Sequence, residues 1–144
     1  MIGIEFEKEN EYDNFLKDMF DNFSLKNKIV SIEESEIFNF NLNNQTIAGN
    51  EFIKAIKNSR DYYILFAKIT IIDEEKASIP IETYNDFINS KCNLLILIHD
   101  GIYVEIYFND NELKEKILHN LSKKKIKYRI KTIKNDTRTK MSVL

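Results

Sequence analysis

Cysteine, histidine and glycine are scarce in this chain of 144 residues, and their scarcity excludes several kinds of site. The one cysteine, Cys92, allows no internal disulfide, and a lone thiol fits a reducing compartment. The two histidines, His99 and His119, lie in separate segments and form no zinc-like cluster with Cys92. Three glycines are too few for the familiar Gly-rich loops that bind phosphates. We therefore expect no metal site and no cofactor.

Long hydrophobic segments are missing as well. The longest apolar run, from Tyr62 to Ala67, has six residues, whereas a helix that crosses a membrane needs about 20. The first residues include Glu5 and Glu7, where a signal peptide would have a basic region followed by an apolar one. We expect a cytoplasmic protein without a membrane partner.

The composition is that of an ordinary globular protein, with 43% hydrophobic and 31% charged residues. The length suits one domain, and no repeat or linker divides it, so we expect a single domain over residues 1–144. Charge is unevenly placed: residues 1–110 have 20 acidic and 10 basic side chains, whereas residues 111–144 have 3 and 11. Such asymmetry can attract a partner or hold two parts of one domain together.

A β-hairpin is the clearest pattern, and we expect the rest of the chain to pack around it. Leu94 to Ile98 is an unbroken apolar run too short for a helix, which predicts a strand buried on both faces. Asp100-Gly101 suits a two-residue turn in which both central residues have positive φ. Residues 102–108 then alternate between apolar and more polar side chains, as a return strand does.

The remaining segments alternate between strands and amphipathic helices. We expect strands at residues 2–6, 29–32, 37–42, 61–72 and 126–132, and helices at residues 12–23, 51–58, 84–89 and 111–122. The first helix is predicted from an apolar stripe that starts at Tyr12 and ends at Phe23. The carboxylates between the second and third strands predict a solvated turn, because the spacing of a calcium loop is missing. They are Glu33, Glu34 and Glu36.

Two neighbouring pairs of strands have connections short enough to force antiparallel pairing. We therefore predict an α+β fold with a mixed, largely antiparallel sheet of five to seven strands and helices mainly on one face. A three-layer α/β sandwich is the alternative.

Few residues could support catalysis. Cys92 and His99 could be a thiol and its base, but seven residues of extended strand would separate them by about 23 Å. We expect Cys92 to be a small buried hydrophobe instead. His99 beside Asp100 is a weak candidate for a general base, and His119 is expected to face solvent.

Two groups of side chains remain as candidate binding sites. Tyr103, Glu105 and Tyr107 share one face of the return strand and could line a ligand groove with His99 and Arg138. The alternative, which we favour, is a face packed under a loop with Glu105 paired to a lysine or arginine.

The second group is Lys127, Arg129 and Lys131, which share one face of the last predicted strand. These cations could contact phosphates or an acidic protein partner. The alternative, which we favour here too, is a solvated basic face that balances an acidic remainder.

Four stretches of the chain together resemble a known family. They are Tyr62 to Ala67, Phe87 to Cys92, Tyr103 to Tyr107 and Asn135 to Thr139. The chain resembles an uncharacterised family of small bacterial proteins, a domain of unknown function found mainly in spore-forming Gram-positive bacteria. The resemblance covers nearly the whole chain and implies a bacterial cytoplasmic origin, but it brings no activity, cofactor or catalytic residue. It also directs attention to Asp136 and Arg138, which could order against the sheet or form a recognition tail.

The leading hypothesis is a small, non-catalytic binding or regulatory protein whose partner is another protein. A toxin-neutralising or immunity-type role is one version of it, by analogy with small acidic proteins that lack active sites. The second hypothesis is an enzyme or small-ligand binder that uses the face of Tyr103, Glu105 and Tyr107. The third is nucleic-acid binding through the basic C-terminal third, which the net negative charge disfavours. No pattern in the sequence indicates an oligomeric state.

Overall fold

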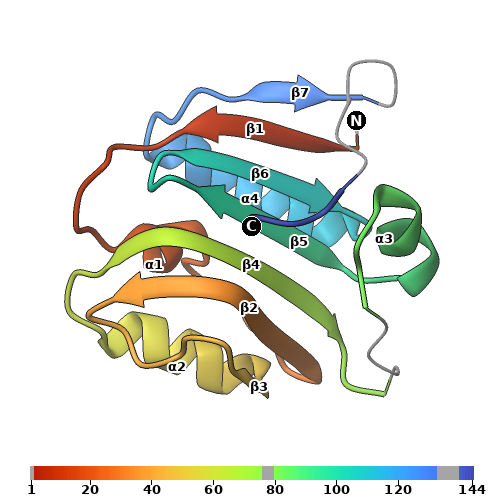
Figure 1. Cartoon of the computed structure of the whole chain (residues 1–144), viewed down its shortest axis with the longest axis horizontal. Helices are drawn as coiled ribbons and strands as arrows, with labels where there is room; N and C mark the ends of the chain where they lie inside the picture. Colours follow the sequence, from red (N-terminus) through yellow and green to blue (C-terminus); the bar gives the residue numbers. More distant parts are fainter. Residues whose placement is uncertain (1, 76–79, 133–139) are drawn as a thin grey trace.

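The computed structural model describes residues 2–75, 80–132 and 140–144, and over these residues it has a seven-stranded sheet and four helices (Figure 1). The strands are β1 (Gly3–Glu7), β2 (Lys28–Phe38), β3 (Thr46–Ala48), β4 (Tyr63–Asp73), β5 (Leu94–His99), β6 (Tyr103–Phe108) and β7 (Arg129–Lys131). The helices are α1 (Phe15–Met19), α2 (Gly49–Asn58), α3 (Tyr84–Ser90) and α4 (Asn111–Lys123).

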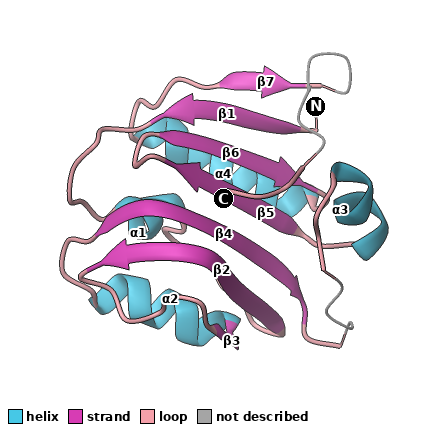
Figure 2. Cartoon of the chain, in the orientation of Figure 1, coloured by secondary structure: helices cyan, strands magenta, loops and turns pink. Residues whose placement is uncertain are grey.

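The strands lie in the order β3-β2-β4-β5-β6-β1-β7, and each pair of neighbours is antiparallel. Helices α1, α2 and α4 cover one face of the sheet (Figure 2). The predicted α+β fold is therefore confirmed, with its helices mainly on one face. The sheet is wholly antiparallel in these pairings rather than mixed.

The main hydrophobic core lies between the sheet and these three helices. One row of it crosses four strands in register and consists of Ile69, Ile96, Ile106 and Ile4. Each of these side chains is fully buried, and such burial stabilises the fold by about 1.5–3 kcal/mol per side chain. The central strands are apolar on the face that the helices cover, because the side chains of this row are shielded from water there.

We call the opposite face of the sheet, which is turned toward the viewer in Figure 1, the front face. Helix α3 and the C-terminal residues pack on part of it and bury a second apolar cluster. The members of this front cluster are Ile81, Phe87, Cys92, Leu95, Leu97, Tyr107 and Met141. Met141 donates its backbone N–H to the carbonyl of Glu82 (2.7 Å), so the C-terminal residues run beside the segment that leads into α3.

The central hairpin forms as predicted. Asp100 and Gly101 both have positive φ (54° and 71°), and the N–H of Ile102 donates to the carbonyl of His99 (3.0 Å). A Cβ on Gly101 would lie 2.2 Å from the hydroxyl of Tyr63. This position therefore requires glycine both for its backbone conformation and for the close approach of a side chain.

The first helix is much shorter than the predicted span of residues 12–23. Asp13 forms a β-bridge with Tyr62, and α1 begins only at Phe15. The prediction that Tyr12 lies in the core is wrong, because its side chain is 55% exposed. The remaining aromatic and aliphatic residues of the stripe are buried as predicted. The bridge explains the difference, since it keeps this part of the chain extended.

The strand predicted at residues 29–32 and the beginning of the strand predicted at residues 37–42 form one strand, β2, which ends at Phe38 and has register shifts between Glu33 and Ile37. The solvated turn predicted there is therefore wrong. Glu34 has a φ of 44° at this irregularity, which lets the strand continue past an extra residue. The chain turns back at Asn39 (φ 68°), and the unpredicted β3 then pairs with the start of β2.

The last strand, β7, is shorter than the predicted span of residues 126–132 and excludes Lys127. Asp136 and Arg138 lie outside the described residues.

Candidate functional site

Charged side chains cross the front face in one row. The register places Glu33, Lys68, Leu97, Glu105, Glu5 and Arg129 opposite one another on six neighbouring strands. Leu97 divides this row into a group around Lys68 and a group around Glu105. Each group has its own hollow.

Glu105 has three polar neighbours. Tyr107 donates its hydroxyl to one carboxylate oxygen (2.9 Å), and the ammonium of Lys131 lies 3.5 Å from the same oxygen. The Nε2 atom of His99 lies 3.4 Å from the other oxygen without forming a hydrogen bond. Tyr107 is fully buried beneath the rings of α3, whereas Tyr103 is 49% exposed. The predicted group thus shares one face, but its members have different surroundings.

The basic side chains of β7 face acidic neighbours. Glu5 lies 3.1 Å from Nε of Arg129 and 3.4 Å from the ammonium of Lys131. Lys131 is buried, and its ammonium also lies 5.6 Å from the ring centre of Tyr107. Lys127 is exposed and lies outside the strand. Of the three predicted cations, two are therefore neutralised within the sheet.

A hollow of about 360 Å³ lies above this network. His99, Tyr103 and Glu105 line it together with Glu5 and Arg129. The structure thus brings three of the five predicted ligand-binding residues to one hollow. Tyr107 does not line it, because this side chain is covered by α3.

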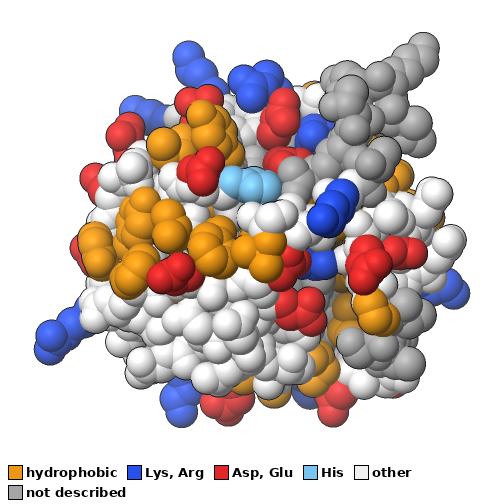
Figure 3. All heavy atoms as spheres, viewed as in Figure 1, with side chains coloured by type: hydrophobic (Ala, Val, Ile, Leu, Met, Phe, Trp, Pro, Cys, Tyr) orange, Lys and Arg blue, Asp and Glu red, His pale blue; other side chains and the backbone are white. Residues whose placement is uncertain are grey.

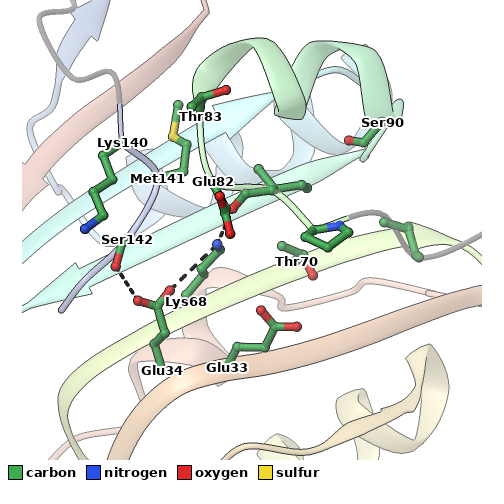
Figure 4. A pocket seen from close by; sticks show the side chains of 13 residues that line it. Glu33, Glu34, Lys68, Thr70, Glu82, Thr83, Ser90, Lys140, Met141 and Ser142 are labelled. Carbon is green, nitrogen blue, oxygen red and sulfur yellow. Dashed lines mark hydrogen bonds and ion pairs between the residues drawn. The ribbon is translucent and has the colours of Figure 1, made fainter.

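The sequence did not point to the group around Lys68. This lysine is 6% exposed, and its ammonium donates to the carbonyl of Ile81 and lies 3.7 Å from Glu34. Ser142 donates its hydroxyl to the other oxygen of Glu34, as Figure 4 shows. The group lines a larger cavity of about 740 Å³ between β2, β4 and residues 80–83 and 140–142. The sequence feature that could have indicated this group is a single lysine among the apolar residues of a buried strand.

Cys92 is unsuited to nucleophilic chemistry. It is fully buried, and its Sγ atom lies 3.3 Å from the carbonyl of Ile71. Burial raises the pKa of this thiol to about 11, so little thiolate is present near pH 7. His119 is exposed, as predicted.

Within the described residues, no group of three or more His, Cys, Asp and Glu side chains is arranged to hold a metal ion. In the same part of the chain, none of the helices has the length and apolar character needed to cross a membrane.

Three aromatic rings form an exposed patch at one end of the front face. Tyr63 lies between Tyr12 (5.6 Å between ring centres) and Phe38 (6.2 Å), and we call these three residues the aromatic patch. Tyr12 is 55% and Phe38 42% exposed. Figure 3 shows hydrophobic side chains gathered on the left of this face, with acidic side chains beside them. Sequence analysis missed the patch because Tyr12 fitted a helical stripe and Phe38 fitted a half-buried strand.

Comparison with known proteins adds a family but no activity. An "Uncharacterized protein YncE" from Bacillus subtilis (strain 168) is 27% identical over 154 aligned residues, which cover 98% of both chains. No solved structure matches the chain. Residues 1–142 match the family described as "Protein of unknown function (DUF2691)". The resemblance to a domain of unknown function from Gram-positive bacteria is thus confirmed, and the chain belongs to the DUF2691 family.

Proposed function

We propose that the protein is a small, non-catalytic protein-binding protein whose partner docks on the aromatic patch. The observation that carries the proposal is three rings in contact on the front face, with Tyr12 and Phe38 about half exposed. Exposed aromatic residues are enriched at protein interfaces, because each buries a large area at a small cost in side-chain entropy. A regulatory or immunity-type role in the cytoplasm is one form of this function.

The fold holds the patch in place before any partner binds. Tyr63 donates its hydroxyl to the side-chain oxygen of Asn10 (2.5 Å) and packs against the hairpin turn at Gly101. The β-bridge between Asp13 and Tyr62 holds the backbone next to Tyr12, whose ring packs against that of Tyr63. Rings that are already ordered lose little entropy on binding, which favours affinity.

The groups that could support catalysis are engaged within the fold, which also favours a binding function. The thiol of Cys92 is buried, and burial raises its pKa to about 11. Glu105 is occupied by Tyr107 and Lys131.

The test compares two variants that each remove two exposed hydrophobic side chains. The patch variant is Tyr12→Ser with Phe38→Ser, and the control variant is Ile88→Ser with Ile130→Ser, whose side chains are 42% and 51% exposed. Proteins captured from the producing cells are quantified by mass spectrometry. We expect at least one protein that the wild type and the control capture equally to be about tenfold depleted on the patch variant.

Thermal unfolding of both variants shows whether they remain folded. If every protein captured by the wild type is captured equally by the folded patch variant, or if none is captured above background, the proposal is wrong.

A second candidate function is small-ligand binding in the hollow above Glu105. The observation that favours it is the position of His99, whose buried Nε2 atom makes no hydrogen bond although it lines the hollow. Ligand screening by NMR tests it, with the imidazole signals of His99 as the reporter and His119 as the control. A ligand that shifts only His99 supports this function, and a screen that leaves His99 unmoved removes it.

A further inference from the structure

The chain around the aromatic patch is strongly acidic. Four segments contribute to the patch or contact it: residues 7–14, 36–39, 60–63 and 99–103. They carry seven carboxylates and two basic side chains, Lys8 and Arg60. These four segments therefore hold half of the net negative charge of residues 1–110.

Among the described residues, little of this negative charge is in ion pairs. Lys8 pairs with Asp13 (3.1 Å), and its side chain is only 4% exposed. The other six carboxylates of these segments are exposed and have no ion-pair partner among the described residues: Glu7, Glu9, Glu11, Glu36, Asp61 and Asp100. At the opposite edge of the sheet, in contrast, Glu5 is paired with Arg129 and Lys131. We call four of these six, Glu9, Glu11, Glu36 and Asp100, the acidic rim.

We infer that the partner presents a basic surface with arginine side chains to the aromatic patch, an inference that rests on the proposed function. The guanidinium group stacks on aromatic faces and binds carboxylates with two parallel hydrogen bonds. The patch offers aromatic faces and the rim offers carboxylates, and Figure 3 shows acidic side chains beside the hydrophobic ones on this face. Complementary charge would also speed the encounter and make binding sensitive to salt.

The direct test uses peptides of nine identical residues as probes, with arginine, lysine or glutamate. Two-dimensional NMR of the labelled protein shows where each peptide binds. We expect the arginine peptide to shift the signals of Tyr12, Phe38 and Tyr63, the lysine peptide to do so more weakly, and the glutamate peptide to leave them unmoved.

Two variants of equal net charge separate the rim from a general charge effect. The rim variant is Glu9→Gln, Glu11→Gln, Glu36→Gln and Asp100→Asn. The control variant changes four exposed acids elsewhere: Glu51→Gln, Glu74→Gln, Glu112→Gln and Glu115→Gln. We expect the rim variant to bind the arginine peptide about tenfold more weakly and the control variant to bind within about twofold of wild type.

Equal loss in both variants, or arginine-induced shifts away from the patch, would overturn the inference. The outcome is separable from that of the proposed function. If the captured partner depends on Tyr12 and Phe38 but binds the rim variant as well as the wild type in both low and high salt, the docking function stands and the basic partner is wrong. If the peptide and the captured partner both lose affinity for the rim variant, the inference is supported.

Discussion

Lys68 shows how one charged side chain is accommodated in the middle of a sheet. Removing an ammonium group from water costs several kcal/mol unless new partners replace the water. Here the partners are the carbonyl of Ile81 and the carboxylate of Glu34, which also accepts the hydroxyl of Ser142. The lysine therefore links β4 to β2, to the segment before α3 and, through Glu34, to the C-terminal residues.

Replacing Lys68 by methionine should destabilise the fold by about 2–3 kcal/mol. The apolar replacement leaves Glu34 without its cation, and a carboxylate left unpaired at a buried site is costly. This loss is small for a broken buried ion pair, because the side chain of Glu34 is 21% exposed and water can reach it. Urea unfolding at pH 7, followed by circular dichroism, measures the loss.

Two further variants make this result specific. Lys140→Met removes an exposed lysine at the edge of the same cavity and should change stability by less than about 0.5 kcal/mol. The double variant Lys68→Met with Glu34→Leu removes both charges and should recover most of the loss. A single Lys68→Met variant as stable as wild type would show that the ion pair does not hold these segments together.

The pairing of Lys68 could be predicted from the sequence only in part. A lysine between Ala67 and Ile69 in a long apolar segment is visible as a charge that needs a partner. Its partner, Glu34, was assigned to a solvated turn, because the four polar residues around it look like a break between two strands. The backbone irregularity that turns Glu34 toward β4 has no signature in local composition.

At the scale of elements, local patterns predicted those parts of the fold that depend on local forces. The hairpin turn at Asp100-Gly101 and the helix α2 follow from turn chemistry and from helical spacing. Helix α1 and strand β3 were mispredicted or missed, because each depends on a distant partner. Asp13 is kept extended by its β-bridge with Tyr62. Strand β3 forms because it pairs with the edge of β2.

The N-terminus of helix α3 is stabilised by a capping box, in which two residues satisfy each other's backbone N–H groups. Thr83 accepts the N–H of Asp86 (3.2 Å), and the carboxylate of Asp86 accepts the N–H groups of Glu82 and Thr83 (3.0 Å each). Thr83→Ala removes one of these acceptors and should lower the free energy of unfolding by about 1 kcal/mol. Urea unfolding checks this value, and Ser24→Ala, at an exposed position outside the helices and strands, is the control.

The same cap should respond to acid. The N–H groups of Glu82 and Thr83 hold the pKa of Asp86 below its ordinary value of 3.8. A lowered pKa means that the ionised carboxylate stabilises the fold above pH 4 and loses this effect as the pH falls through the folded-state value. The stability difference between wild type and Asp86→Asn should therefore be present at pH 7 and shrink at acid pH. A difference that does not change with pH would contradict this role.

At the scale of the whole molecule, the sheet separates two apolar clusters of unequal size. The main core is closed by three helices, whereas the front cluster is closed by α3 and the C-terminal residues. A small cluster closed by short segments is expected to open more readily than the main core. Cys92 belongs to the front cluster and reports on such opening, because its thiol reacts only when it is exposed.

Met141→Ala should open the front cluster without opening the main core. Met141 is fully buried, so its truncation should cost about 3 kcal/mol. If the front cluster opens independently, Cys92 in this variant should react with a thiol reagent much faster than in an Ile117→Ala variant of similar stability. Ile117 is equally buried, but it lies in the main core. Leu144→Ala, at a site 77% exposed, should leave the rate unchanged. Equal rates for Met141→Ala and Ile117→Ala would mean that the thiol is exposed only by global unfolding, and the two clusters would then form a single cooperative unit.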